Sequence, residues 1–484
     1  MKLSTSLAAL SLSSAFMLSA DAWTITSSDV QPRPNAPSNH QDFVKYWTVE
    51  GNSALTSMTV GVVGRVFVDY DPSLAAVETK DVSYASSTSG AGEEDVVAGA
   101  SDVVVARVAV SGDSQELLNA IEVVAVSPDI DADGIKLRFK NEDFDGAGYL
   151  LTEVTVGARQ ALTSIATVGA GDLVISTDAM ASHDSNASIQ LTAAGSGDLF
   201  VHAPNETLEI GALEISTAGS GDIQVDVARL QVQTDVEINI AGSGDIAVVA
   251  ADAVVVGDSL SSSIGGSGDV FVQSAWFETT ELETSIAGSG DVTYSRNGSC
   301  ATQHVEVAGS GDVAAGSIVC VNSSVEIVGS GDVVVQTTEK LDVSTVFSGT
   351  VKYVNAPPKT IVTSSVVHFR KHHDTVSKAK KNKFDEYELE PVPSREATHV
   401  KLRLRESIFS DEPRRGGFWS WLIGSDDDSD GEDVTLSLSR HVPAASSPAI
   451  AAVLLMAVGL VGLVATVRRV QQHHERRQYK PLLH

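Results

Sequence analysis

Residues 218–225 read Ala-Gly-Ser-Gly-Asp-Ile-Gln-Val, and the tetrad Gly-Ser/Ala-Gly-Asp at the centre of this stretch occurs eight times in the chain. The eight copies end at Asp172, Asp198, Asp222, Asp245, Asp269, Asp291, Asp312 and Asp332. Successive copies lie 26, 24, 23, 24, 22, 21 and 20 residues apart, and a decayed ninth copy, Ser348-Gly349-Thr350, follows 18 residues later. A repeat of this length indicates stacked structural units.

The residues around each tetrad alternate between apolar and polar. Ile223 and Val225 are the first and third residues after Asp222, and the other copies are similar. Runs such as Val236-Glu-Ile-Asn precede the tetrads. A period of two residues predicts strands with one buried face, so each repeat reads as strand, tight turn, strand. Stacked coils lie about 4.8 Å apart, and only stacking buries their aliphatic side chains. The sequence therefore predicts an all-β parallel solenoid of about nine coils.

The recurring pattern [A/V]-G-S-G-D-[V/I]-x-[V/L], from about Val154 to Val354, resembles the auto-transporter adhesin head (GIN) domain family. The resemblance implies a right-handed parallel β-helix on a secreted or surface protein, an adhesion-like role and no catalytic residues. We expect this β-helix over residues 151–356, behind a β-rich N-terminal cap at residues 23–150. Gly146-Ala-Gly-Tyr149, 23 residues before Asp172, reads as a degenerate first turn.

The eight aspartates form one predicted column along the solenoid. In register, neighbouring carboxylates would lie roughly 5 Å apart and repel by about 0.8 kcal/mol per pair in water. An Asp in a tight turn ordinarily caps backbone amides, which makes the column structural in the first interpretation. Calcium bound along the column is the alternative. We expect no other cofactor and no separate metal site.

Cysteines and glycosylation sequons fall within the repeat. Cys300 and Cys320 lie nine and eight residues after the preceding Asp, at nearly equivalent places on adjacent coils, which favours a disulfide in an oxidising compartment. Two buried free thiols are the alternative. Four N-x-S/T sequons, all outside the turns, are candidate glycan acceptors: Asn186, Asn205, Asn297 and Asn322.

Both ends of the chain carry targeting features. Residues 1–22 read as a signal peptide that ends in an A-x-A site. Residues 444–467 contain no charge and would form about 36 Å of helix, enough to span a bilayer. Arginines follow at once, so residues 468–484 are the predicted cytosolic tail of a type I single-pass protein. Residues 357–443 read as a charged juxtamembrane stalk, with a strand at Thr398 to Leu404.

The tail contains Tyr479-Lys-Pro-Leu482, which resembles the Y-x-x-Φ sorting signal that clathrin adaptors bind. A simple solvated tail is the alternative.

Composition restricts the function. Lys and Arg number 33 against 63 Asp and Glu, and the net charge of -30 argues against nucleic acid as a partner. We expect a non-enzymatic protein of the plasma membrane or endomembranes. Its extracellular or lumenal β-helix would bind a protein or a glycan. The alternatives are a sorting receptor that uses the tail signal and a polysaccharide-active β-helix enzyme. The enzyme is disfavoured because the carboxylates repeat identically and basic residues are scarce along the repeat.

Overall fold

The computed structural model describes residues 23–33, 40–75, 103–126, 134–140, 144–365 and 376–404. The predicted signal peptide, membrane span and sorting motif lie outside these residues. Within them, no helix has both the length and the apolar character needed to cross a membrane.

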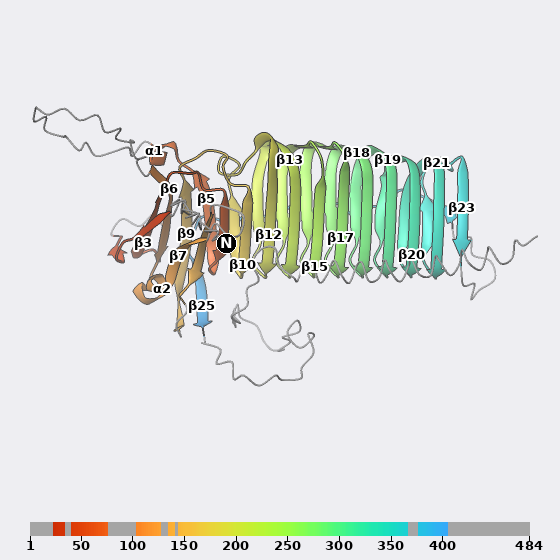
Figure 1. The fold of residues 1–484 in the computed structure, drawn as a ribbon. Helices are drawn as coiled ribbons and strands as arrows, with labels where there is room; N and C mark the ends of the chain where they lie inside the picture. Colours follow the sequence, from red (N-terminus) through yellow and green to blue (C-terminus); the bar gives the residue numbers. More distant parts are fainter. Residues whose placement is uncertain are drawn as a thin grey trace, which may run out of the picture.

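A parallel β-solenoid of about nine turns dominates the structure, as predicted (Figure 1). Its winding sense, expected to be right-handed, stays a prediction. Its strands pair in parallel, in register, along the whole stack: β10 (Ser164–Gly169), β11 (Gly171–Ile175), β12 (His183–Gly195), β13 (Leu199–Gly219), β14 (Ile223–Val232), β15 (Val236–Gly242), β16 (Ile246–Val256), β17 (Ser259–Gly266), β18 (Val270–Gly288), β19 (Val292–Gly309), β20 (Val313–Gly329), β21 (Asp332–Phe347), β22 (Thr350–Tyr353), β23 (Thr360–Ser365) and β24 (Val376–Lys378). Each tetrad pairs with the tetrad of the next coil, so equivalent residues form ladders.

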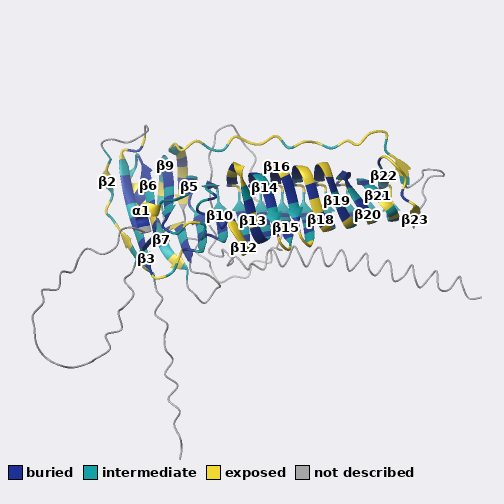
Figure 2. Cartoon of the chain, turned by 90° about the horizontal axis from the view of Figure 1, so that it is seen from above, coloured by how far each residue is buried: buried dark blue, intermediate teal, exposed yellow. Residues whose placement is uncertain are grey.

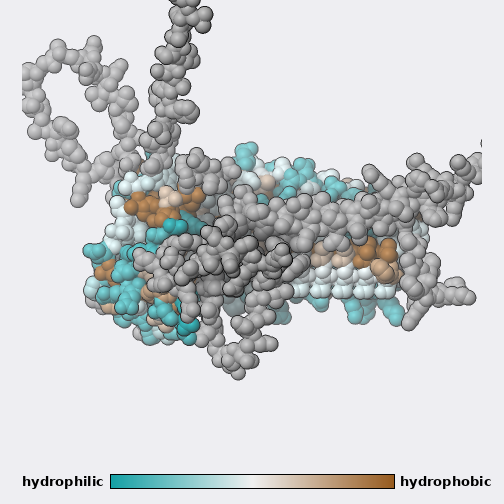
Figure 3. Space-filling view, turned by 60° about the horizontal axis from the view of Figure 1, so that its bottom comes forward, coloured by the Kyte–Doolittle hydropathy of each residue, from teal (hydrophilic) through white to brown (hydrophobic). Residues whose placement is uncertain are grey.

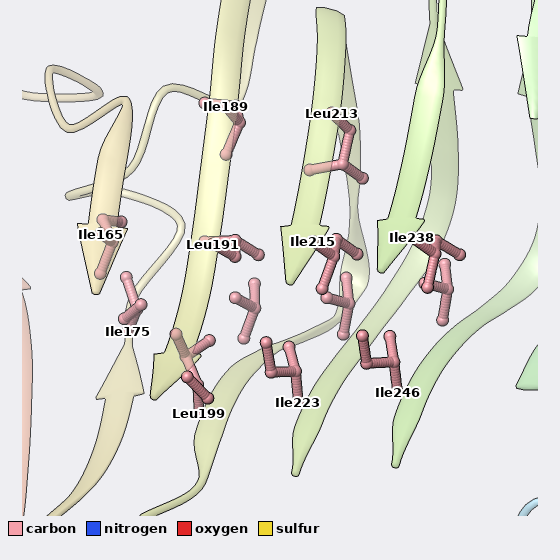
Figure 4. Close-up of a cluster of buried hydrophobic side chains, with 14 of the residues drawn as sticks. Ile165, Ile175, Ile189, Leu191, Leu199, Leu213, Ile215, Ile223, Ile238 and Ile246 are labelled. Atoms are coloured by element: carbon pink, nitrogen blue, oxygen red, sulfur yellow. The ribbon is translucent and has the colours of Figure 1, made fainter. Parts of the chain in front are cut away.

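The core consists of aliphatic ladders that face each other across each coil (Figure 4). Leu191, Ile215 and Ile238 come from strands that precede the turns, and Ile223 and Ile246 from strands that follow them. All are at most 1% exposed, and each contributes about 1.5–3 kcal/mol by burial. The low aromatic content therefore agrees with coils that are filled mainly by branched aliphatic side chains.

The first glycine of each tetrad is required by the stacking of the turns. Gly242 has φ 147°, in the region that L-residues rarely adopt. A Cβ on Gly242 would lie 2.1 Å from the carbonyl oxygen of Gly219 in the preceding coil. The amide of Ser243 donates to that same oxygen at 2.8 Å. Neighbouring turns therefore stack backbone on backbone, and Figure 3 shows even rows of near-neutral residues repeating along the rod.

The N-terminal region contributes further strands and two short helices: β1 (Thr24–Ser27), β2 (Gln31–Pro32), β3 (Phe43–Gly51), β4 (Ser57–Gly61), β5 (Gly64–Tyr70), α1 (Pro72–Ala75), β6 (Val103–Gly112), α2 (Gln115–Asn119), β7 (Ile121–Val126), β8 (Gly134–Phe139) and β9 (Phe144–Val156). Strands β4 and β5 pair in parallel with β10 and β11 on one side and with β8 and β9 on the other. They therefore form a coil of the stack. Strands β3, β6 and β7 pair antiparallel and close this end.

The predicted degenerate turn at Gly146–Tyr149 is wrong. These residues lie inside β9, and the turn that stacks on the first tetrad is Gly61-Val-Val-Gly64. Residues 146–149 lie on the edge of β9 along which another strand pairs.

That other strand is β25 (Thr398–Leu404), which pairs antiparallel with β9 (Figure 1). The strand predicted at this position is therefore present, but the stalk prediction around it needs correction. Strands β22, β23 and β24 extend the solenoid, and residues 379–397 lie along one side of the rod from the last coils back to the cap (Figure 2). We call residues 379–397 the strap.

Candidate functional site: the aspartate column

The eight tetrad aspartates form a hydrogen-bonded column. The Oδ1 atom of each carboxylate from Asp172 to Asp312 accepts the backbone N–H of the aspartate in the next coil. These bonds span 2.7–2.8 Å from Asp198 to Asp332, and the first, from Asp198 N to Asp172 Oδ1, spans 3.4 Å. Bonds between a carboxylate and an amide are stronger than neutral ones. The carboxylates therefore cap backbone amides between coils.

Cationic side chains stand at both ends of the column. Arg65 of β5 pairs in register with Asp172 and occupies the column position in its own coil. At the other end, Lys352 Nζ lies 2.5 Å from Asp332 Oδ2. The decayed ninth tetrad adds Thr350, which pairs in register with Asp332 and donates its hydroxyl to Oδ1. The repeat pattern did not mark Arg65 or Lys352, because neither lies in a tetrad.

Burial raises the pKa of five of the eight column carboxylates: Asp172, Asp198, Asp245, Asp291 and Asp312. Burial raises the pKa of Asp198 to about 6; the amide of Asp222 opposes the shift, and the charges of Asp172 and Asp222 reinforce it. The same cause, burial first, raises the pKa of Asp245, and the charges of its column neighbours add to it.

Asp332 at the end of the column differs. Burial opposes the change, but the hydrogen bonds from Lys352 and Thr350 lower its pKa.

Calcium on the column stays a prediction. Among the described residues, no three or more His, Cys, Asp or Glu side chains gather in an arrangement that could hold a metal ion. Each column residue from Asp172 to Asp312 has one oxygen bonded to an amide. These bonds to amides agree with the structural interpretation of the column.

The predicted disulfide is confirmed. Cys300 and Cys320 are register partners on β19 and β20, with their Cα atoms 4.5 Å apart, and their sulfur atoms are bonded. The four sequon residues, Asn186, Asn205, Asn297 and Asn322, are all exposed and lie outside the turn column. Their glycosylation stays a prediction.

Comparison with known proteins supports the family assignment. Residues 237–357 match the family model described as "Putative auto-transporter adhesin, head GIN domain". This segment of the chain is similar to adhesin head GIN domains. The match covers the regular coils from β15 to the end of β22 and so includes the part of the repeat with the shortest period.

Solved structures similar to this chain come from Parabacteroides species. A "putative adhesin" of Parabacteroides merdae is 11% identical, with 70% of this chain and 96% of that chain covered and a TM-score of 0.32. A "putative lipid binding protein" of Parabacteroides distasonis is 18% identical, with 69% and 97% covered and a TM-score of 0.31. A "putative adhesin" of the same species is 14% identical, with 74% and 98% covered and a TM-score of 0.29. No curated protein matches the chain.

Proposed function

We propose that the chain is a non-enzymatic, adhesin-like surface protein whose solenoid binds a protein or glycan partner along one flat face. The family match supports an adhesin-like role. The predicted signal peptide and membrane span would place the solenoid outside the cytosol as a type I single-pass protein.

The observation that carries the proposal is a regular polar ladder along the strands that precede the turns. Its members are register partners on successive coils and point away from the aliphatic core: Gln190, Glu214, Glu237, Ser261, Glu283, His304, Ser324 and Asp342. All are exposed or half-buried. We call this ladder the open face, because the strap makes its hydrogen bonds to the strands that follow the turns.

The open face has the properties of a binding surface for an extended partner. Its side chains repeat about every 4.8 Å, so an extended ligand could contact a polar side chain on each successive coil. Carboxylates, hydroxyls and an imidazole offer hydrogen bonds suited to sugar hydroxyls or to a basic protein surface. The tetrad carboxylates cap amides, so they do not form the unique acid–base pair that a glycosidase needs.

A binding assay with a charge-reversal pair tests the proposal. The purified protein is applied to a glycan array and to cells, and Glu237→Lys with Glu283→Lys is compared with Asp252→Lys at the exposed bend of β16. We expect the wild type and Asp252→Lys to bind a common set of ligands and the double variant to lose at least tenfold in affinity. Absence of binding by the wild type, or equal binding by all three proteins, would refute the proposal.

A further inference from the structure

The strap is held on the rod mainly through its backbone. The amide of Glu390 donates to Gln224 Oε1 at 2.8 Å, and Gln224 Nε2 donates back to the carbonyl oxygen of Glu390 at 3.2 Å. The amide of Tyr387 donates to Gln273 Oε1 at 3.2 Å. The Tyr387 ring packs on Phe271, with ring centroids 5.2 Å apart. Two glutamines and one aromatic contact thus fix the centre of the strap.

Ion pairs and further hydrogen bonds also hold the strap on the rod. Glu386 lies 3.6 Å from Arg296 of β19. Arg395 binds Asp69 at 2.6 Å and lies 3.5 Å from Glu153, while Arg65 donates to Ser394.

The centre of the strap places acidic residues beside the aspartate column. Residues 385–390 read Asp-Glu-Tyr-Glu-Leu-Glu. The charge of Glu390 acts on Asp198 and Asp245 of the column, and the charge of Asp385 acts on Asp291. Burial raises the pKa of Tyr387, and the charges of Glu390, Asp222, Asp245 and Asp198 add to this rise. The nearby His202–Asp226 pair on β13 and β14 is a further titratable pair on this side of the rod.

We propose that the strap is a pH-sensitive clasp, which binds the solenoid more tightly in mildly acidic solution than at neutral pH. The strap carries its own acids to the side of the rod where the column carboxylates are stacked. Uptake of protons by the column carboxylates removes a repulsion that opposes docking, and leaves the glutamine contacts and the Tyr387–Phe271 contact unchanged.

The direction of the pH dependence of docking follows from the raised pKa values of the column carboxylates. Burial, followed by neighbouring charges that include Glu390, raises the pKa of Asp198 to about 6. Burial raises the pKa of Asp291 too, and Asp385 is among the charges that add to it. A carboxyl whose pKa is raised by docking favours the docked state below that pKa. The contribution is lost as the pH rises through about 6.

Hydrogen–deuterium exchange on the full-length chain tests the clasp, because the Tyr387 and Glu390 amides exchange only when the strap leaves Gln273 and Gln224. After correction for the intrinsic rate at each pH, we expect protection of peptides 382–395 to be about fivefold greater at pH 5.0 than at pH 7.5. Asp385→Asn with Glu390→Gln should show the high protection at both pH values.

Two variants serve as controls. Glu388→Gln removes one charge from the same exposed stretch, at a residue that is not a source of the raised pKa values in the column, so it should keep most of the pH dependence. Phe271→Ala should lower protection at both pH values while the far-UV circular dichroism of the β-solenoid is retained. Equal protection of the wild type at the two pH values, or an unchanged pH dependence in the doubly neutralised variant, would overturn the proposal.

Discussion

Replacing Asp198 by Asn removes one charge from the column and keeps an oxygen where the Asp222 amide donates at 2.8 Å. The pKa of Asp198 is raised from 3.8 to about 6, chiefly by burial. A shift of about two pH units corresponds to about 3 kcal/mol. Asp198 is half-buried, so solvent screening reduces this to about 1 kcal/mol. At pH 7.5 the Asp198→Asn variant should therefore be more stable than the wild type by about 1 kcal/mol.

The pH dependence gives the sharper test of this reasoning. A group whose pKa is raised by folding stabilises the fold when protonated, and this stability is lost as the pH rises through about 6. The wild type should gain stability between pH 7.5 and pH 5, and the advantage of Asp198→Asn should vanish below about pH 3.8, where the carboxyl is protonated in the folded and the unfolded state. Thermal unfolding of the two proteins at matched ionic strength measures this, with a difference of about 2 °C expected at pH 7.5.

Asp332→Asn is the matched variant, and its change in stability at pH 7.5 should have the opposite sign. Lys352 and Thr350 lower the pKa of Asp332 despite its burial, so loss of this charge should cost about 0.5–1 kcal/mol at pH 7.5. This cost should shrink in acid, because protonation of Asp332 breaks the same ion pair in the wild type. If both Asn variants shift the melting temperature in the same direction at pH 7.5, the assignment of repulsion to the column interior is refuted.

Three further outcomes are expected. Gly242→Ala forces a Cβ against the Gly219 carbonyl at an unfavourable φ and should cost about 3 kcal/mol in urea unfolding, whereas Ser243→Ala should change stability by under about 0.5 kcal/mol. Replacing both Cys300 and Cys320 by Ala should cost about 2–4 kcal/mol, and a reductant should then lower the melting temperature of the wild type alone. EDTA should leave the melting temperature unchanged, because backbone amides offset the repulsion between the column carboxylates. A rise in the melting temperature on addition of calcium would favour the calcium interpretation instead.

The sequence predicted the coils because their stacking depends on a local pattern. Each tetrad carries its own glycines and is followed by alternating aliphatics, so the fold, the column and the Cys300–Cys320 bridge all follow from the spacing of copies. The coil formed by β4 and β5 was missed. Its turn is Gly61-Val-Val-Gly64, Arg65 takes the place of the aspartate, and a long stretch separates it from its neighbour β10. Register across such a separation depends on tertiary pairing, which no local pattern records.

The strap was missed for a different reason. Its charged composition is typical of a solvated linker, and its partners are Gln224 and Gln273, which stand at outward positions that differ from coil to coil. Positions that differ between copies give no signal in a repeat pattern. The side chains that break the repeat, here two glutamines and Phe271, are the ones that fix where the strap lies.

The strap also changes how the rod would be presented on a surface. A solenoid followed directly by a stalk would have its last coil nearest the membrane. Instead, β25 returns the chain to β9, so the chain leaves the described fold at Leu404, beside the N-terminal cap. In the predicted type I arrangement the cap is therefore covalently nearest to the span at 444–467. The coil that contains β23 lies at the opposite end of the rod, where Ile361 and Val362 are exposed. A partner that approaches from outside would reach this end and the open face before it reaches the cap.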